Sequence, residues 1–207
     1  MKWLNEQGIL LGKFLTGKFR RTLGLCALGM LLTVLLGVGV GLLVPEQAAQ
    51  ALNSFMEQIE QSGVITDEGQ MSVFALLMNN WRAMLISAAY GFVPFLFLPV
   101  ISLVTNGALL GMLGAVFTAR GMPLTAYLAG ILPHGVFELT ALVFSIACGV
   151  HLCRNMCHLV TSHPDRTPLP AVLEDLLRVL VMVVAPLTVA AAFVECYVTP
   201  VIMGLFL

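Results

Sequence analysis

Two long stretches without a charged side chain constrain most strongly what this chain can fold into. Residues 23–44 and 83–119 contain no Asp, Glu, Lys or Arg. About 20 apolar residues in a helix cross a bilayer core of roughly 30 Å. The chain is 59% hydrophobic and 10% charged, against about 25% charged in typical soluble domains. Because helices satisfy their own backbone in lipid, the sequence predicts an all-α, polytopic integral membrane protein.

The longer of these two runs is too long for a single crossing. As a straight helix, residues 83–119 would extend about 55 Å, so we expect the chain to turn back near Pro99. Residues 124–132 are apolar but too short to cross, which favours a re-entrant half-helix that ends at Pro133. The sequence therefore predicts one membrane domain with five spans, over residues 23–44, 80–98, 100–118, 136–153 and 179–200.

The distribution of basic residues predicts the orientation. Residues 1–21 combine basic and large apolar side chains, which is typical of an amphipathic helix on the lipid of the cytoplasmic face. Residues 46–80 are acidic and predict an external interfacial segment, with helices over 46–61 and 72–80. Residues 154–178 hold three arginines and predict a cytoplasmic loop. We therefore expect a cytoplasmic N-terminus and an external C-terminus.

Small residues predict close helix packing in two of the spans. Gly37, Gly39 and Gly41 lie in the first span, and Gly107 and Gly111 lie four apart in the third. Glycine faces let helix backbones approach each other in a membrane. These faces also suit dimerisation.

One ionisable pair lies inside an otherwise apolar stretch, in the segment Pro133 to Leu139. His134 and Glu138 are four residues apart, so a helix places them on one face. A carboxylate in hydrocarbon costs roughly 2.5–3.5 kcal/mol, so this pair must face protein, water or a partner. Pro133 suits the first turn of a helix, and Gly135 would let another backbone come close.

A depth comparison adds a third ionisable residue to this pair. Counted from the cytoplasmic ends of their spans, Glu138 and Glu195 lie at nearly the same level, about 25 Å up a straight helix. His134 lies one turn further out. We therefore predict that the three side chains form a buried polar cluster, with Arg82 or Arg120 as a counter-charge.

The His134–Glu138 pair allows three interpretations. It is a structural pair that fixes helix packing, part of an ion or proton path, or a catalytic or metal site. A metal hydrolase needs at least three protein ligands and a bound water, and this pair supplies two ligands. We therefore predict no enzymatic activity, no bound metal and no cofactor.

A second set of His and Cys residues follows in His151-x-Cys153-x-x-x-Cys157-His158. The residue types resemble a metal-ligand set, but the spacing matches no standard zinc module. Free cysteines and interfacial histidines are the favoured interpretation. A net charge of −1 argues against general nucleic-acid binding.

The segment Ile131 to Leu139 closely resembles the signature of the stage II sporulation protein M family, through its Pro-His-Gly-x-x-Glu core. Asn106-Gly107-x-x-x-Gly111 matches the small-residue segment that precedes this core in the family. Thr140 departs from the pattern, because the family often has proline there.

The resemblance implies a non-enzymatic membrane scaffold. In spore formers, such a protein would recruit cell-wall-degrading partners during engulfment. It would lie in the bacterial inner (cytoplasmic) membrane as a homodimer or in a hetero-complex with membrane or cell-wall proteins. The alternative is a small transporter or channel that uses the buried His and Glu side chains.

Overall fold

The computed structural model describes residues 2–61 and 71–206, and within these ranges every regular element is helical. The predicted all-α fold is therefore confirmed. The α-helices are α1 (Lys2–Thr16), α2 (Lys18–Leu43), α3 (Pro45–Gln61), α4 (Val73–Ala89), α5 (Pro99–Ala119), α6 (Leu124–Val160), α7 (Leu169–Val179), α8 (Ala185–Phe193) and α9 (Thr199–Met203). A 3₁₀ turn, η1 (Tyr90–Phe92), follows α4, and two π-helical segments, η2 (Leu180–Val184) and η3 (Val194–Val198), flank α8.

Four continuous helices of the described chain are long and apolar enough to cross a membrane, namely α2, α5, α6 and the helix that runs over Leu169–Met203. The predicted span at 80–98 is not among them. Its first ten residues belong to α4, which begins already at Val73 and ends at Ala89, and the rest form η1 and the loop before α5. The prediction of a separate short helix over 72–80 was wrong, because one helix continues through these residues to Ala89. Ser72 caps its start by accepting a hydrogen bond from the Ala75 N–H at 3.3 Å.

Helices α2 and α5 form a close pair through four of the five predicted glycines, whereas a Cβ at the fifth, Gly39, would meet nothing within 4 Å. A Cβ atom at Gly41 would lie 2.6 Å from the Ala115 Cβ, and one at Gly37 would overlap the backbone of Ala108. Gly107 and Gly111 meet α2 in the same way from the α5 side. The predicted close packing is confirmed at these four positions.

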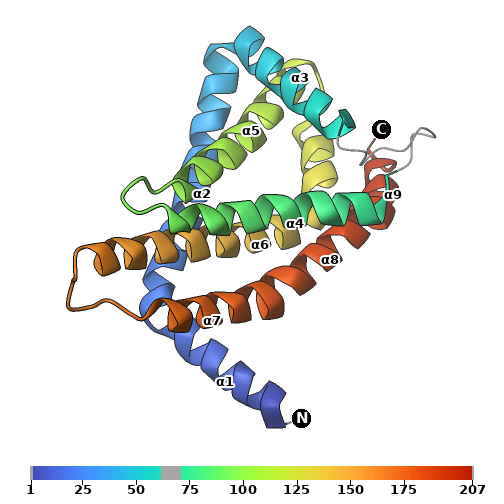
Figure 1. Cartoon of the computed structure of the whole chain (residues 1–207). Coiled ribbons are helices and arrows are strands. Elements are labelled where there is room, and N and C mark those ends of the chain that lie inside the picture. Colours follow the sequence, from blue (N-terminus) through green and yellow to red (C-terminus); the bar gives the residue numbers. More distant parts are fainter. Residues whose placement is uncertain (1, 62–70, 207) are drawn as a thin grey trace.

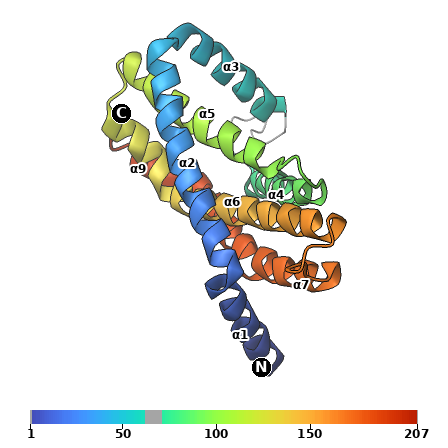
Figure 2. The same cartoon turned by 90° about the vertical axis from the view of Figure 1, so that its left-hand side faces the viewer.

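Helix α6 lies at the centre of the molecule and is continuous through Pro133. The predicted re-entrant half-helix over 124–132 was therefore wrong, and Pro133 is not in a first turn. Proline has no N–H for the Ala129 carbonyl and its ring crowds that group. Figures 1 and 2 show the result, since the yellow N-terminal part of α6 runs at an angle to its orange C-terminal part.

The C-terminal half of α6 carries the main core. Ile146, Ala147 and Cys148 are fully buried there. The Ser145 hydroxyl donates to the Met84 carbonyl of α4, which joins the two helices. Figure 1 shows α4 beside α6 along this contact.

The predicted loop 154–178 is mostly helical, because α6 continues to Val160 and α7 begins at Leu169. The side chain of Asn155 fixes the turn between them. Its Oδ1 accepts from the Thr167 N–H at 2.9 Å and its Nδ2 donates to the Thr167 carbonyl at 3.0 Å.

The basic N-terminal segment consists of two helices instead of one. Helix α1 ends at Thr16, and Lys18 already belongs to α2, with Gly17 between them. Figure 2 shows α1 and α3 at opposite ends of α2. The predicted helix over 46–61 is confirmed as α3.

Candidate cation site

Three ionisable side chains meet where α6 faces the last helix of the chain. His134 and Glu138 come from α6, one turn apart, and Glu195 comes from η3. A ring nitrogen of His134 and one carboxylate oxygen of each glutamate all lie within 4.8 Å of one another, and all three residues are half-buried. The structure thus brings together three of the five residues that the sequence assigned to a polar cluster.

Prolines account for the local geometry of the last helix. Each π-helical segment ends two residues before a proline, at Pro186 and at Pro200. Because proline donates no hydrogen bond and its ring crowds the carbonyl four residues earlier, the helix widens before it into a π turn. In η3 this wider turn closes with a hydrogen bond from the Thr199 N–H to the Val194 carbonyl. Glu195 therefore lies in a widened turn and not in a regular α-helix.

Thr199 orients the His134 ring. Its hydroxyl lies 3.2 Å from His134 Nδ1 and donates to the Val194 carbonyl at 3.3 Å. A hydroxyl has one proton to donate, so the His134 ring must supply the proton of the first contact from Nδ1. In the neutral imidazole, Nε2 is then the nitrogen that can accept a proton or bind a metal.

The charge of the cluster is not balanced by arginine. Arg82 and Arg120 are both exposed, and neither forms an ion pair with Glu138 or Glu195. The predicted counter-charge was therefore wrong. Arg82 instead lines a separate hollow beside α4 with Trp81. Two neighbouring carboxylates repel each other when both are ionised, so the cluster requires a cation such as a shared proton, an imidazolium or a metal ion.

The geometry suits a cation with an imidazole and two carboxylates as ligands. Zn²⁺ binds such ligands at about 2.0–2.2 Å in tetrahedral geometry, which places neighbouring ligand atoms roughly 3.4 Å apart. The three atoms lie within 4.8 Å of one another, so the side chains would have to close in by about 1 Å to bind this ion. Imidazole with carboxylates is also a donor set for Mn²⁺ and Fe²⁺. A proton shared between the two carboxyl groups requires no further ligand.

The other residues of the family motif lie elsewhere. Around Gly135, the nearest atoms to an added Cβ belong to Ile131 and Leu139 of its own helix, so the expected close approach of another backbone does not occur. Asn106 is exposed inside α5, and its Nδ2 donates to the Ser102 carbonyl at 2.8 Å.

The second His and Cys set serves the packing of a loop. Cys157 Sγ accepts from the Phe95 N–H at 3.1 Å, and the Cys153 thiol donates to the Val93 carbonyl at 3.3 Å. In the part of the chain that the structure describes, this set does not converge as metal ligands.

Thr199 was missed by sequence reasoning. The available signal was its position four residues after Glu195 and directly before Pro200, which repeats the spacing of His134 and Glu138. That spacing places Thr199 near the face of Glu195.

Fold and site together define a helical membrane protein in which two long apolar helices share an ionisable cluster. The sequence profile of the family described as Stage II sporulation protein M matches residues 30–200, and the chain belongs to this family. It is also 29% identical over 131 residues to an uncharacterised protein of Methanocaldococcus jannaschii, a match that covers 63% of this chain and 72% of that protein. No solved structure matches the chain.

Proposed function

We propose that this protein binds a cation at the cluster of His134, Glu138 and Glu195 and passes it across the membrane. The observation that carries the proposal is the meeting of these three side chains within 4.8 Å. Ionisable groups inside membrane helices mark ion and proton pathways when they are retained at such cost.

The irregular helix geometry around the cluster supports transport. Pro133 precedes His134 in the bent part of α6, and the π turn η3 carries Glu195. Transporters often place their ion sites where helices are interrupted, because backbone groups freed there help to bind the ion.

Flux measurements in proteoliposomes test this function. We expect uptake of protons, Zn²⁺ or Mn²⁺ above that of protein-free vesicles, detected with a dye inside the vesicle for each cation. Glu138→Gln and Glu195→Gln should abolish the uptake, whereas Glu6→Gln, which changes an exposed residue of α1, should leave it unchanged. Uptake that is absent for all three cations, or unaffected by the two cluster variants, would contradict the proposal.

A second function is favoured by family membership. We propose that the protein also acts as a non-enzymatic scaffold that holds partner proteins at the bacterial cytoplasmic membrane, in a homodimer or a hetero-complex. The match of the Stage II sporulation protein M profile over residues 30–200 supports this proposal.

Affinity purification in mild detergent tests the scaffold function. A partner should be recovered with the wild-type chain and also with Glu138→Gln, because recruitment does not depend on cation passage. Recovery of the chain alone, or only with copies of itself, in several detergents would argue against recruitment.

A further inference from the structure

A cavity with several charged side chains in its wall lies where α1, the start of α2, the end of α6 and α7 meet, away from the His134 cluster. Its volume is about 220 Å³. The titratable part of its wall includes Lys13, Lys18, His151, Arg154, His158 and Asp165. Residues far apart in the sequence thus converge on one basic cavity.

The three cations of this cavity are not neutralised by the described part of the chain. Lys13, Lys18 and Arg154 have no described carboxylate within ion-pair distance. Asp175 also lines the cavity, but its carboxylate is held at 2.6 Å by the Arg178 guanidinium.

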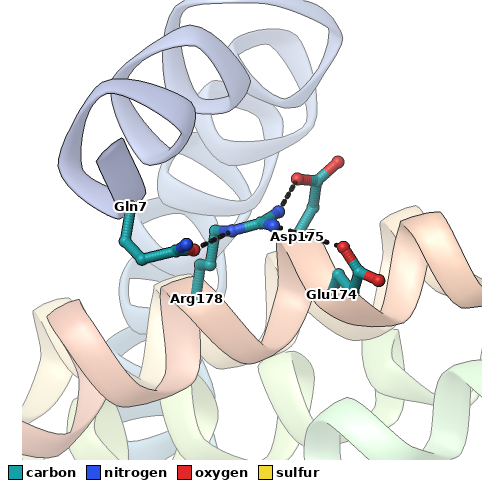
Figure 3. A network of polar contacts seen from close by, with 4 residues as sticks. All are labelled: Gln7, Glu174, Asp175 and Arg178. Carbon is teal, nitrogen blue, oxygen red and sulfur yellow. Dashed lines mark hydrogen bonds and ion pairs between the residues drawn. The ribbon is translucent and has the colours of Figure 1, made fainter. Parts of the chain in front are cut away.

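Figure 3 shows how Arg178 is occupied on its other sides, by Gln7 of α1 at 2.7 Å and by Glu174 at 3.2 Å. This network fixes α1 on α7 and keeps Asp175 engaged. Asp165 is then the one lining carboxylate that no described cation pairs with. One unpaired negative charge in the wall therefore faces three positive charges.

A buried polar atom in the cavity wall also lacks a partner. His151 Nδ1 is inaccessible and forms no hydrogen bond with the described residues. The edges and faces of Phe14 and Phe19 hold the ring in place, with ring centroids 5.3 and 5.7 Å away. A buried ring nitrogen without a partner is unfavourable, and a second imidazole, that of His158, also lines the cavity.

The size and charge of the cavity select a small anion. Drug-sized ligands occupy pockets of roughly 300–1,000 Å³, which exceeds the 220 Å³ available here. Lysine and arginine with an imidazole donor are the usual partners of phosphate oxygens. We infer that this cavity binds a phosphate group, carried either by the headgroup of an anionic phospholipid or by a soluble phosphate.

The surroundings favour the lipid as the source. The cavity lies beside α1, whose apolar residues Trp3, Leu4 and Ile9 are largely exposed, as in a helix that rests on a membrane. Each Lys or Arg near an anionic membrane surface contributes about 1 kcal/mol to lipid attraction, which is about a fivefold change in affinity.

Native mass spectrometry of the full chain in neutral detergent tests this site. The probes are phosphatidylglycerol, phosphatidylcholine and inorganic phosphate, added separately. We expect retained phosphatidylglycerol, which the triple variant Lys13→Gln/Lys18→Gln/Arg154→Gln should bind about a hundredfold more weakly. The control triple variant Lys2→Gln/Arg82→Gln/Arg120→Gln has the same net charge as the cavity triple variant but changes residues outside the cavity. It should therefore bind like the wild type.

The arms of the experiment separate the two sources. If phosphatidylglycerol stays bound when inorganic phosphate is added, the ligand is a lipid headgroup. If inorganic phosphate itself binds, and the cavity variant loses this binding, the ligand is a soluble phosphate. Lys13→Arg/Lys18→Arg keeps both charges and should keep the binding, which guards against loss by misfolding. Equal binding by the cavity and control triple variants, or phosphatidylcholine retained as tightly as phosphatidylglycerol, would overturn the inference.

Discussion

At the scale of single residues, Thr199 is the hydrogen-bond partner of His134 Nδ1 and so orients the ring. The Thr199→Val variant keeps the volume and leaves His134 Nδ1 without its partner at 3.2 Å. We expect the free energy of unfolding in detergent to fall by about 1–3 kcal/mol. Thr140→Val removes an exposed hydroxyl that bonds only the Val136 carbonyl of its own helix, so it should change stability by no more than about 0.5 kcal/mol. Equal effects of the two variants would show that Thr199 does not position His134.

The residues of the cluster show how far sequence reasoning reaches at this scale. Counting along two helices gives the depth of Glu138 and Glu195, because the rise per residue is constant. Depth says nothing about the direction in which a side chain points around its helix. The prediction for Arg82 and Arg120 failed for this reason. Their depth is suitable, but both side chains are exposed and neither pairs with the cluster.

At the scale of helices, two glycines of α2 provide a matched comparison. A Cβ at Gly37 would overlap the Ala108 backbone, whereas one at Gly39 would meet nothing within 4 Å. Gly37→Ala should lower the free energy of unfolding by about 1–3 kcal/mol through overpacking. Gly39→Ala should leave it unchanged or raise it by up to about 1 kcal/mol, because alanine favours helix. A denaturant titration in detergent micelles measures both, and destabilisation by Gly39→Ala of the same size would contradict the packing of α2 on α5.

Pro200 allows a second test, of the π turn that carries Glu195. In Pro200→Ala the N–H returns, and we expect η3 to become regular α-helix and turn Glu195 away from His134. Zn²⁺ binding, measured by calorimetry, should fall while stability is kept. Pro170→Ala, in the first turn of α7, is the control because proline is tolerated there. Unchanged Zn²⁺ binding in Pro200→Ala would show that the cluster does not need the π turn to bind the ion.

The bounds of the helices were less predictable than their packing faces. The glycines of α2 and α5 act through their small size, and this property follows directly from the residue type. Whether Pro133 ends a helix or bends it depends on the neighbours that support the strained turn, and α6 has such neighbours in α8 and α9. The start of α4 at Val73 likewise depends on the cap at Ser72 and on contacts with Ala192.

At the scale of the whole molecule, the ends of α4 show how it lies relative to the spanning helices. Near its start, Leu76 packs on Ala192, close to η3. Beyond its end, a Cβ at Gly91 would lie 2.8 Å from Leu152 Cβ, in the C-terminal half of α6. Figure 1 shows the same arrangement, with the start of α4 near α9 and its end next to the loop that leads to α5.

The basic residues near the two ends of this arrangement indicate its orientation. Lys13, Lys18 and Arg154 line one cavity, so the basic residues of the N-terminal segment and of the end of α6 lie on the same side. The positive-inside rule predicts that this side is cytoplasmic. Helix α3 lies at the far end of α2 (Figure 2), and its first turn is acidic, with Glu46.

These positions lead to a prediction about the number of passes. Helix α4 has 17 residues, which is the lower limit for a crossing helix, and it runs alongside α6 between the two sides. We predict that α4 crosses the membrane as a fifth pass, with the N-terminus in the cytoplasm and the C-terminus outside. Reporter fusions at the two ends of the full chain should then report opposite compartments. If α4 lay on the surface, four passes would remain and both ends would report the same compartment.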